Sequence, residues 1–158
     1  MKLNKLLGVI ALPLFAITLV AQEVEEVVIT GSYIKSSPTD GASPVEIIGR
    51  DEIDNLNATT IADITANIAV NSGSENNSDS FTQGSTQGTS NINLRGLGLS
   101  STLVLVDGKR HTLAGNTAND GSVFVNTSSI PVIALDRVEV LKEGAASIYG
   151  SDAVAGVV

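Results

Sequence analysis

The sequence holds few side chains suited to catalysis. His111 is the only histidine, and cysteine is absent, which excludes a thiol nucleophile, a cysteine-ligated zinc ion and a disulfide framework. No Gly-x-Ser-x-Gly motif occurs, and Gly96-Leu97-Gly98 lacks the third glycine and the helix of a dinucleotide-binding loop. A secreted hydrolase that uses His111 as a base is the weakest of the alternatives. We therefore predict that the protein is not an enzyme and carries no cofactor.

Asp79 and the run Asn119-Asp120-Gly121 are the positions that resemble a calcium site. Their oxygen atoms would suit calcium, but the spacing of an EF-hand loop is absent. Asparagine, aspartate and glycine in succession are also typical of a turn. We therefore predict a turn at 119–121 and no metal site.

Two long polar stretches are the best candidates for contacting a ligand. Ser, Asn, Gly, Thr and Gln dominate residues 71–91 and 114–122, and neither stretch contains lysine or arginine. The first cannot form a core, and about twenty residues is long for a loop, so it is either disordered or a binding loop. Hydroxyl and amide groups suit a sugar or another neutral polar molecule better than an anionic iron chelate. A solvated linker is the alternative, above all for residues 71–79.

Short elements should position the first polar stretch. A strand is predicted at Val45–Ile48, and a short helix with acidic residues at its start is predicted near Asp51–Asn55. A second helix should follow Thr60, which can cap it together with Asp63 as in a capping box. Its isoleucines recur on one helix face, which should pack against a sheet: Ile61, Ile64 and Ile68.

Strand signals return after the first polar stretch. Ile92–Leu94 is predicted to be extended, and Leu103–Val106 is apolar throughout, as in a central strand buried on both faces. Asp107-Gly108 predicts a hairpin turn that returns the chain through Arg110 to Leu113.

The last third of the chain contains one more predicted strand. A turn of helix is predicted near Pro131, and Arg137–Leu141 is predicted to be a strand. Its side chains should alternate, with Arg137 and Glu139 outward and the two valines between and after them inward.

The N-terminus has the pattern of an export signal followed by a tether. Lys2 and Lys5 precede the apolar run Leu6–Val20, and Ala21 is a small residue suited to a cleavage site. The run is shorter than the ~20 residues that span a bilayer, so we predict a removable signal peptide at 1–21. Residues 22–44 combine a β-branched run with a segment rich in turn formers, which predicts a flexible tether ahead of a domain at 45–158.

The charge of the chain argues against nucleic acid as a partner. Nine Lys and Arg residues stand against 17 Asp and Glu residues, which gives a formal net charge of −8. Nucleic-acid phosphates would be repelled by such a surface.

Four stretches of the sequence resemble the TonB-dependent outer-membrane receptors, and the resemblance covers roughly residues 25–158. They are EEVVITGS at 25–32, NLRGLG at 93–98, LVLVDGKR at 103–110 and IPVIALDRVEVLKEGAASIYGSDAVAGVV at 130–158. The resemblance implies a plug domain of α+β class, with a small mixed β-sheet, short helices and long polar loops. Such a plug fills a 22-stranded outer-membrane β-barrel and is displaced when an inner-membrane complex pulls on it.

The resemblance also implies roles for particular residues. The TonB box, which binds TonB of the inner-membrane energising complex, would be Glu26, Val27, Val28, Ile29 and Thr30. Contacts between plug and barrel would be made by Arg95, Arg137 and Glu139. The loops that contact an extracellular small-molecule or oligosaccharide cargo would contain Phe81, Gln83, Gln87, Asn116, Asn119 and Asp120. An exposed β-branched segment such as the TonB box can add as a strand to the edge of a partner's sheet.

The barrel itself is not encoded in this sequence. Twenty-two strands need at least ~220 residues, which is more than the whole chain. We therefore expect either a fragment or pseudogene product of an outer-membrane transporter, or an orphan plug that acts as a free periplasmic ligand-binding module. The first expectation places the chain in the cell outer membrane, and the second places it in the periplasm.

Overall fold

The computed structural model describes residues 45–75 and 84–158. The predicted signal peptide, the predicted TonB box and the tether lie outside the described residues, as do Phe81 and Gln83. The strands of the described ranges are β1 (Val45–Gly49), β2 (Thr102–Leu103), β3 (Leu105–Val106), β4 (Lys109–Arg110), β5 (Arg137–Leu141) and β6 (Gly156–Val157). The α-helices are α1 (Arg50–Asn55), α2 (Ile61–Thr65) and α3 (Ala146–Tyr149), and the 3₁₀ turns are η1 (Leu99–Ser101), η2 (Thr127–Ser129), η3 (Val132–Ala134) and η4 (Ser151–Ala153).

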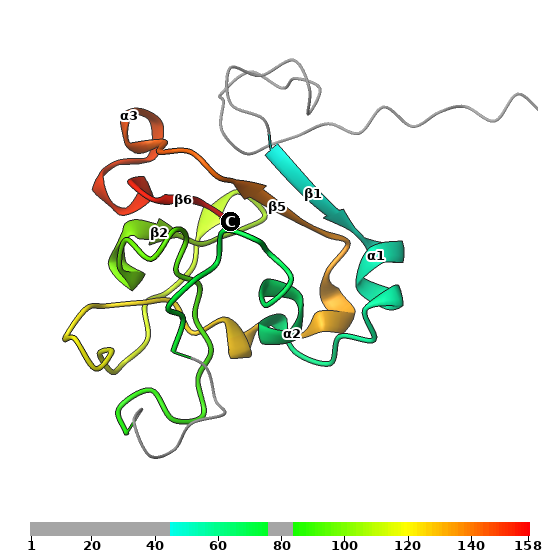
Figure 1. Cartoon of the computed structure of the whole chain (residues 1–158), viewed down its shortest axis with the longest axis horizontal. Coiled ribbons are helices and arrows are strands. Elements are labelled where there is room, and N and C mark those ends of the chain that lie inside the picture. The colour runs from blue at the N-terminus through cyan, green and yellow to red at the C-terminus, as the bar shows by residue number, and fades with distance from the viewer. Residues whose placement is uncertain (1–44, 76–83) are drawn as a thin grey trace, which may run out of the picture.

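A mixed four-stranded sheet lies at the centre of the domain (Figure 1). Its order is β1-β5-β6-β2, with β1 antiparallel to β5 over five residue pairs and β2 parallel to β6. β5 meets β6 at the single antiparallel pair Leu141↔Val157. The α+β class with a small mixed sheet and short helices is thus confirmed.

The capped helix predicted after Thr60 is present as α2. The Thr60 hydroxyl accepts from the Asp63 N–H at 3.2 Å, and Asp63 Oδ2 accepts from the Thr60 N–H at 2.8 Å. These two bonds satisfy donors that a bare helix start would leave open. Hydrogen bonds from the backbone of Thr60 and Thr59 lower the pKa of Asp63.

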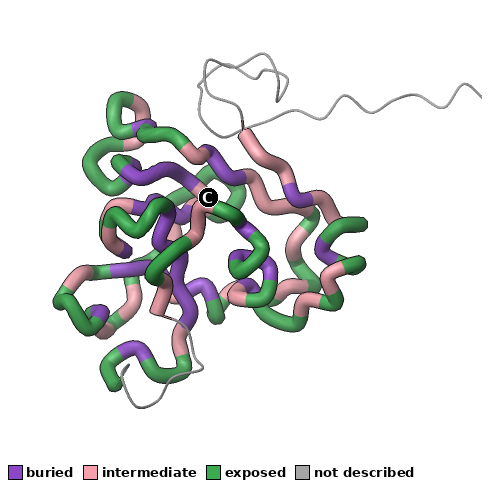
Figure 2. The backbone as a smooth tube through the Cα atoms, in the orientation of Figure 1, coloured by how far each residue is buried: buried purple, intermediate pink, exposed green. Residues whose placement is uncertain are grey.

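Two apolar clusters hold the sheet, one on each side of β5. The first joins Ile48 and Val140 to the isoleucine stripe of α2, where Ile64 is fully buried. The second packs Leu141 with Leu103 and Val157. Figure 2 shows the buried stretches running through the middle of the domain, while exposed stretches gather at its margins. Burial of apolar area on both faces is therefore what stabilises this short-stranded sheet.

The prediction of a central strand at Leu103–Val106 is wrong. The run is split between β2, at the edge of the main sheet, and β3, which pairs with β4 in a separate hairpin. Val106 is 38% exposed. The predicted turn explains the split, because Asp107 and Gly108 both have positive φ, 50° and 71°, and reverse the chain immediately after Val106.

Two further expectations need correction. Ile92–Leu94 is buried, but it forms only an isolated bridge between Leu94 and Asn71 and no strand. Asparagine side chains occupy the backbone groups that a neighbouring strand would use. On β5, Glu139 does not point into solvent, because its carboxylate accepts from Arg137 Nε at 2.8 Å and its side chain is only 10% exposed.

Candidate functional site

The second polar loop, residues 114–122, is a closed and anchored loop. Its base is joined by the bond from Ala114 N–H to Phe124 O at 2.8 Å, and Ala118 N–H donates to Ser122 O at 2.9 Å. Ala118 is 3% exposed and packs with Leu99 and Phe124, which fixes the loop to a small apolar cluster. The loop therefore presents its remaining side chains from a defined backbone.

The predicted turn at 119–121 is present and explains the acidic residue within it. Gly121 N–H donates to Ala118 O at 2.9 Å, and Asp120 Oδ1 accepts from the hydroxyl and the N–H of Ser122. The hydroxyl bond, followed by the backbone bond, lowers the pKa of Asp120. No group of three or more His, Asp and Glu side chains comes together within 45–75 and 84–158.

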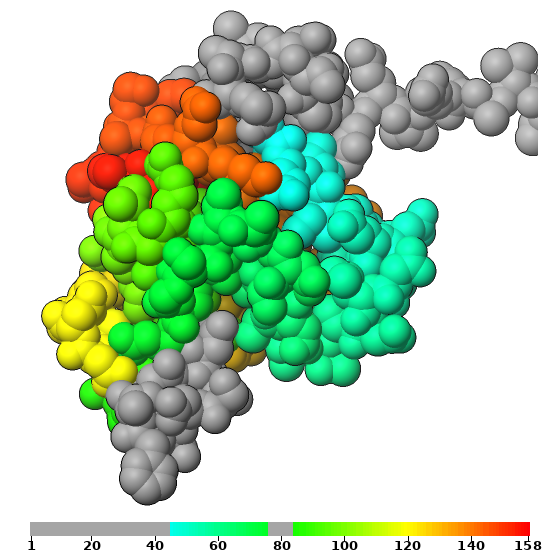
Figure 3. Space-filling view, in the orientation of Figure 1, coloured from blue at the N-terminus to red at the C-terminus, as the bar shows by residue number. Residues whose placement is uncertain are grey.

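The first polar loop is described over residues 71–75 and 84–91, and both parts contact the second loop. Asn116 Nδ2 donates to the carbonyl of Ser85, and both carboxylate oxygens of Glu75 lie 3.2 Å from the N–H of Asn119. Figure 3 shows the yellow atoms of the second loop beside the green atoms of the first. Of the predicted cargo-loop residues, Asn116 and Asn119 thus take part in contacts between the two loops, while Gln87 and Asp120 are exposed positions within them.

Sequence reasoning missed Glu75 and Asn91, which hold the base of the first loop. The Asn91 side chain exchanges two hydrogen bonds of 2.8 Å with the backbone N–H and C=O of Glu75. Glu75 had a detectable signal, since it and Asp79 are the only charged residues in 71–91. Asn91 had no such signal, because asparagine is one of the common residue types of this stretch.

The two polar loops lie far from the point where the tether enters the domain. In Figure 1 the chain reaches the start of β1 at the top, whereas the loops occupy the lower left. The start of β1 and the two polar loops therefore lie at different ends of the described domain.

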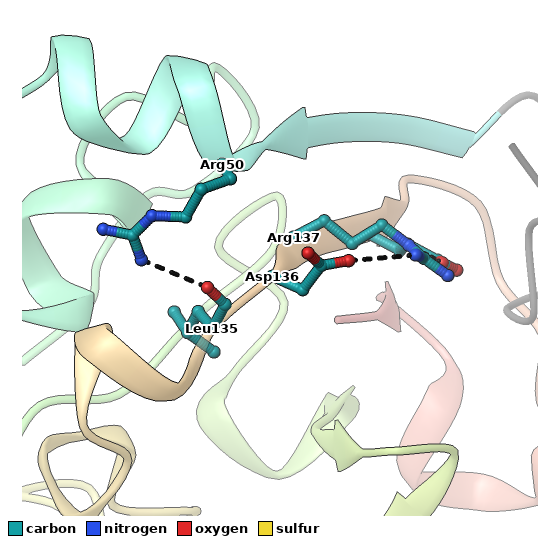
Figure 4. A network of polar contacts seen from close by, with 5 residues as sticks. Arg50, Leu135, Asp136 and Arg137 are labelled. Atoms are coloured by element: carbon teal, nitrogen blue, oxygen red, sulfur yellow. Dashed lines mark hydrogen bonds and ion pairs between the residues drawn. The ribbon is translucent and has the colours of Figure 1, made fainter. Parts of the chain in front are cut away.

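The predicted barrel-contact arginines already have partners within the domain. Arg95 has a positive φ of 59°, and its Nη2 donates to the carbonyls of Ala155 at 2.8 Å and Val154 at 3.3 Å. Arg137 bonds Glu139 and lies 3.4 Å from Asp136, as Figure 4 shows for the second pair. Both guanidinium groups are thus oriented before any second molecule is present.

Arg50 is a further positioned cation that sequence reasoning missed. Its Nη1 donates to the carbonyls of Val132 and Leu135, both at 3.1 Å, which joins α1 to the turn before β5 (Figure 4). The bond to Asp54 raises the pKa of the Arg50 guanidinium. His111, by contrast, shows one side-chain contact, from Nδ1 to its neighbour Thr112 O at 3.1 Å.

Comparisons with known proteins agree on one family. The model of the TonB-dependent receptor plug domain matches residues 37–157. The vitamin B12 transporter BtuB of Vibrio vulnificus (strain YJ016) is 36% identical over 141 residues, which cover 87% of this chain and 21% of that protein. An iron-regulated outer membrane virulence protein of Vibrio cholerae serotype O1 (strain O395) is 38% identical over 71 residues, 44% of this chain and 11% of that protein.

The solved structures include a ferric enterobactin receptor and a siderophore receptor. A ferric enterobactin receptor mutant from Pseudomonas aeruginosa, in complex with enterobactin, is 28% identical with a TM-score of 0.49 and covers 75% of this chain and 17% of that one. This chain belongs to the TonB-dependent receptor plug domain family. It spans about a fifth of the length of the vitamin B12 transporter that it matches. The relatives described above are a transporter, a virulence protein and a receptor, and none is named as an enzyme. No helix in the described ranges has the length and hydropathy needed to cross a membrane.

Proposed function

We propose that this chain is the gating and energy-coupling plug of an outer-membrane transporter that takes up a nutrient actively. The observation that carries the proposal is the family match over residues 37–157. The chain would be exported by a signal peptide at 1–21 and would fill a β-barrel in the outer membrane. The geometry is consistent with coupling, since the start of β1, which the tether precedes in the sequence, and the polar loops lie at different ends of the domain.

The tether would bind TonB through residues 26–30. A β-branched segment can pair with the edge of a partner's sheet by main-chain hydrogen bonds, which transmit a pull without requiring a particular side-chain pocket. The tether leads directly into β1, which is paired with β5 along its whole length. A pull on residues 26–30 would therefore reach the main sheet first.

The cargo would be a neutral polar molecule. Residues 84–90 and 114–122 contain no lysine or arginine, and the one carboxylate among them, Asp120, is occupied by Ser122. Such a surface offers hydroxyl and amide groups and no cation for a strongly anionic chelate. The name of the Vibrio vulnificus relative points to vitamin B12 as one candidate. A neutral oligosaccharide is the other.

The barrel contacts would be made with groups that the plug has already ordered. Within the described residues, Arg95 bonds the carbonyls of Val154 and Ala155 through Nη2. The N–H groups of Nε and Nη1 would then be able to donate to a barrel carboxylate. Arg137 would present its guanidinium to the wall, and Glu139, whose side chain is 10% exposed and accepts from Arg137 Nε, would contribute by orienting it. Such pairs fix orientation more than they add affinity.

A chimeric transporter tests gating and coupling. This chain would replace the matching part of the Vibrio vulnificus transporter, and uptake of labelled cyanocobalamin would be measured in cells that lack their own vitamin B12 transporter. We expect uptake that stops when the proton gradient is dissipated. Val28→Pro should lower energised uptake by about tenfold or more with binding unchanged, because proline removes a donor from the strand pairing.

Ser36→Pro is the matched control, because it adds the same residue to the tether outside the TonB box. We expect it to leave uptake and binding unchanged. Uptake that survives Val28→Pro would refute the coupling role. Binding without energised uptake in the parent chimera would instead favour a free ligand-binding module.

A separate binding experiment tests the cargo class. The full chain would be titrated with cyanocobalamin, maltohexaose and ferric enterobactin, and its thermal unfolding followed. A rise in Tm with either neutral compound and none with ferric enterobactin is expected, because only a ligand that binds the folded state stabilises it. Stabilisation by ferric enterobactin alone would overturn the neutral cargo.

A further inference from the structure

Glu75 lies at the base of the first polar loop, and its backbone is held by a buried side chain. Its N–H donates to Asn91 Oδ1 and its carbonyl accepts from Asn91 Nδ2, both at 2.8 Å. Asn91 is 1% exposed. Its side-chain amide pairs with the backbone of Glu75 in the way that a peptide group of a neighbouring strand would. The backbone of Glu75 is therefore fixed to the interior of the domain.

The side chain of Glu75 reaches the other polar loop. Both carboxylate oxygens lie 3.2 Å from the N–H of Asn119, 44 positions further along the chain. Bonds of this kind to a charged acceptor are stronger than those between neutral groups. Asn119 directly follows Ala118, which is buried against Phe124. The carboxylate thus connects two points that are each anchored in the interior.

The second bridge between the loops is of a different kind. Asn116 donates from its side chain to the Ser85 carbonyl, and Ser85 belongs to an exposed turn. This bridge joins the exposed rim of the first loop to the second loop. The contact of Glu75 with Asn119 joins the base of the first loop to the second loop.

We propose that Glu75 is a positioning residue that holds residues 84–90 of the first polar loop and residues 114–122 of the second together as one cargo-binding surface. The inference rests on the proposed function, because the surface is useful only if the loops bind cargo. It deepens that function, since a neutral polar ligand would contact both loops at once and affinity would depend on a carboxylate that need not touch it. Holding the loops in place beforehand reduces the ordering cost of binding.

The distance between the loops can be measured without any ligand. The chain has no cysteine, so spin labels can be placed specifically at Gln87→Cys in the first loop and Thr117→Cys in the second, both exposed positions. Glu75→Ala should broaden the distance distribution, and Glu75→Gln, which keeps one acceptor oxygen, should broaden it less. Glu52→Ala removes the same charge from exposed α1 and should leave it unchanged.

Cargo affinity is then measured in the chimeric transporter with cyanocobalamin. We expect Glu75→Ala to raise the Kd by about fivefold or more and Glu52→Ala to leave it within about twofold. An unchanged distance distribution in Glu75→Ala overturns the proposal, as does a broadened distribution with unchanged affinity. If the parent chimera binds no cyanocobalamin, the proposal that this plug takes up cyanocobalamin fails. The distance measurement on the spin-labelled chain still shows whether Glu75 holds the loops.

Discussion

Replacing Gly156 with alanine should be among the most damaging single changes in this domain. Gly156 begins β6 with a φ of +148°, in a region that other residues rarely adopt. An added Cβ would lie 2.3 Å from the carbonyl oxygen of Leu141 on β5 and 2.7 Å from Leu94 Cδ1. The Leu94 side chain can rotate, but the Leu141 carbonyl belongs to the paired backbone of the sheet. Either β6 separates from β5 or the strand bends.

The magnitude follows from two separate costs. Backbone strain contributes about 1–3 kcal/mol, and overpacking in a tight core contributes about 1–3 kcal/mol, so we expect a loss of about 4 kcal/mol. A domain of this size has about 5–15 kcal/mol of stability in all. The variant should therefore unfold at a much lower urea concentration or fail to accumulate as a folded protein.

Two other glycines separate these costs. Gly121 has a φ of +83° and nothing within 4 Å of a built Cβ, so Gly121→Ala reports strain alone and should cost about 1–2 kcal/mol. Gly115 has neither a positive φ nor a close neighbour, and Gly115→Ala should change stability by less than about 0.5 kcal/mol. Urea unfolding of the full chain, followed by circular dichroism, measures all three. The reasoning is refuted if Gly156→Ala costs no more than Gly121→Ala.

Three further predictions concern the polar contacts. Thr60→Ala should cost about 1 kcal/mol in urea unfolding because it removes the cap of α2, whereas Thr117→Ala, at an exposed loop position, should cost less than about 0.5 kcal/mol. The pKa of Asp63 is lowered in the folded state. Its contribution to the free energy of unfolding is therefore present above its unfolded-state pKa and is lost as the pH falls through its folded-state pKa. Asp63→Asn should reduce the loss of stability at acidic pH, and an unchanged loss would contradict this. Asn91→Ala should cost about 1–3 kcal/mol because it leaves the backbone of Glu75 without its hydrogen-bond partner. Asp152→Asn weakens the exposed ion pair between Asp152 and Arg110 and should cost less than about 1 kcal/mol. Equal losses in the two variants would disprove the distinction.

Local patterns predicted the parts of the fold that depend on local chemistry. Two such parts are the capping box of Thr60 and Asp63 and the Asp107-Gly108 turn. In both, the contacting residues lie within a few positions of each other, so their spacing in the sequence was sufficient to predict them. The division of Leu103–Val106 between two sheets was not readable, because a run of apolar residues looks the same in one sheet as in two.

The loop arrangement could be predicted only in part. Composition identified both polar stretches as candidate ligand surfaces, but the contact between Glu75 and Asn119 joins residues 44 positions apart. No local pattern marks such a pair, and the same holds for Arg50 with the carbonyls of Val132 and Leu135. The proposed TonB box and signal peptide rest on sequence alone, since they lie outside the described residues.

The pairing of β1 with β5 has a consequence for how the domain is made. β1 is synthesised before the other strands of the sheet, and its partner β5 follows roughly 90 residues later. The main sheet therefore depends on contacts of high sequence separation, which form slowly. Until then β1 offers an unpaired edge on both sides, which is a site for association with other chains. The order of synthesis therefore leaves the first strand of the plug in need of protection until almost the whole domain has appeared.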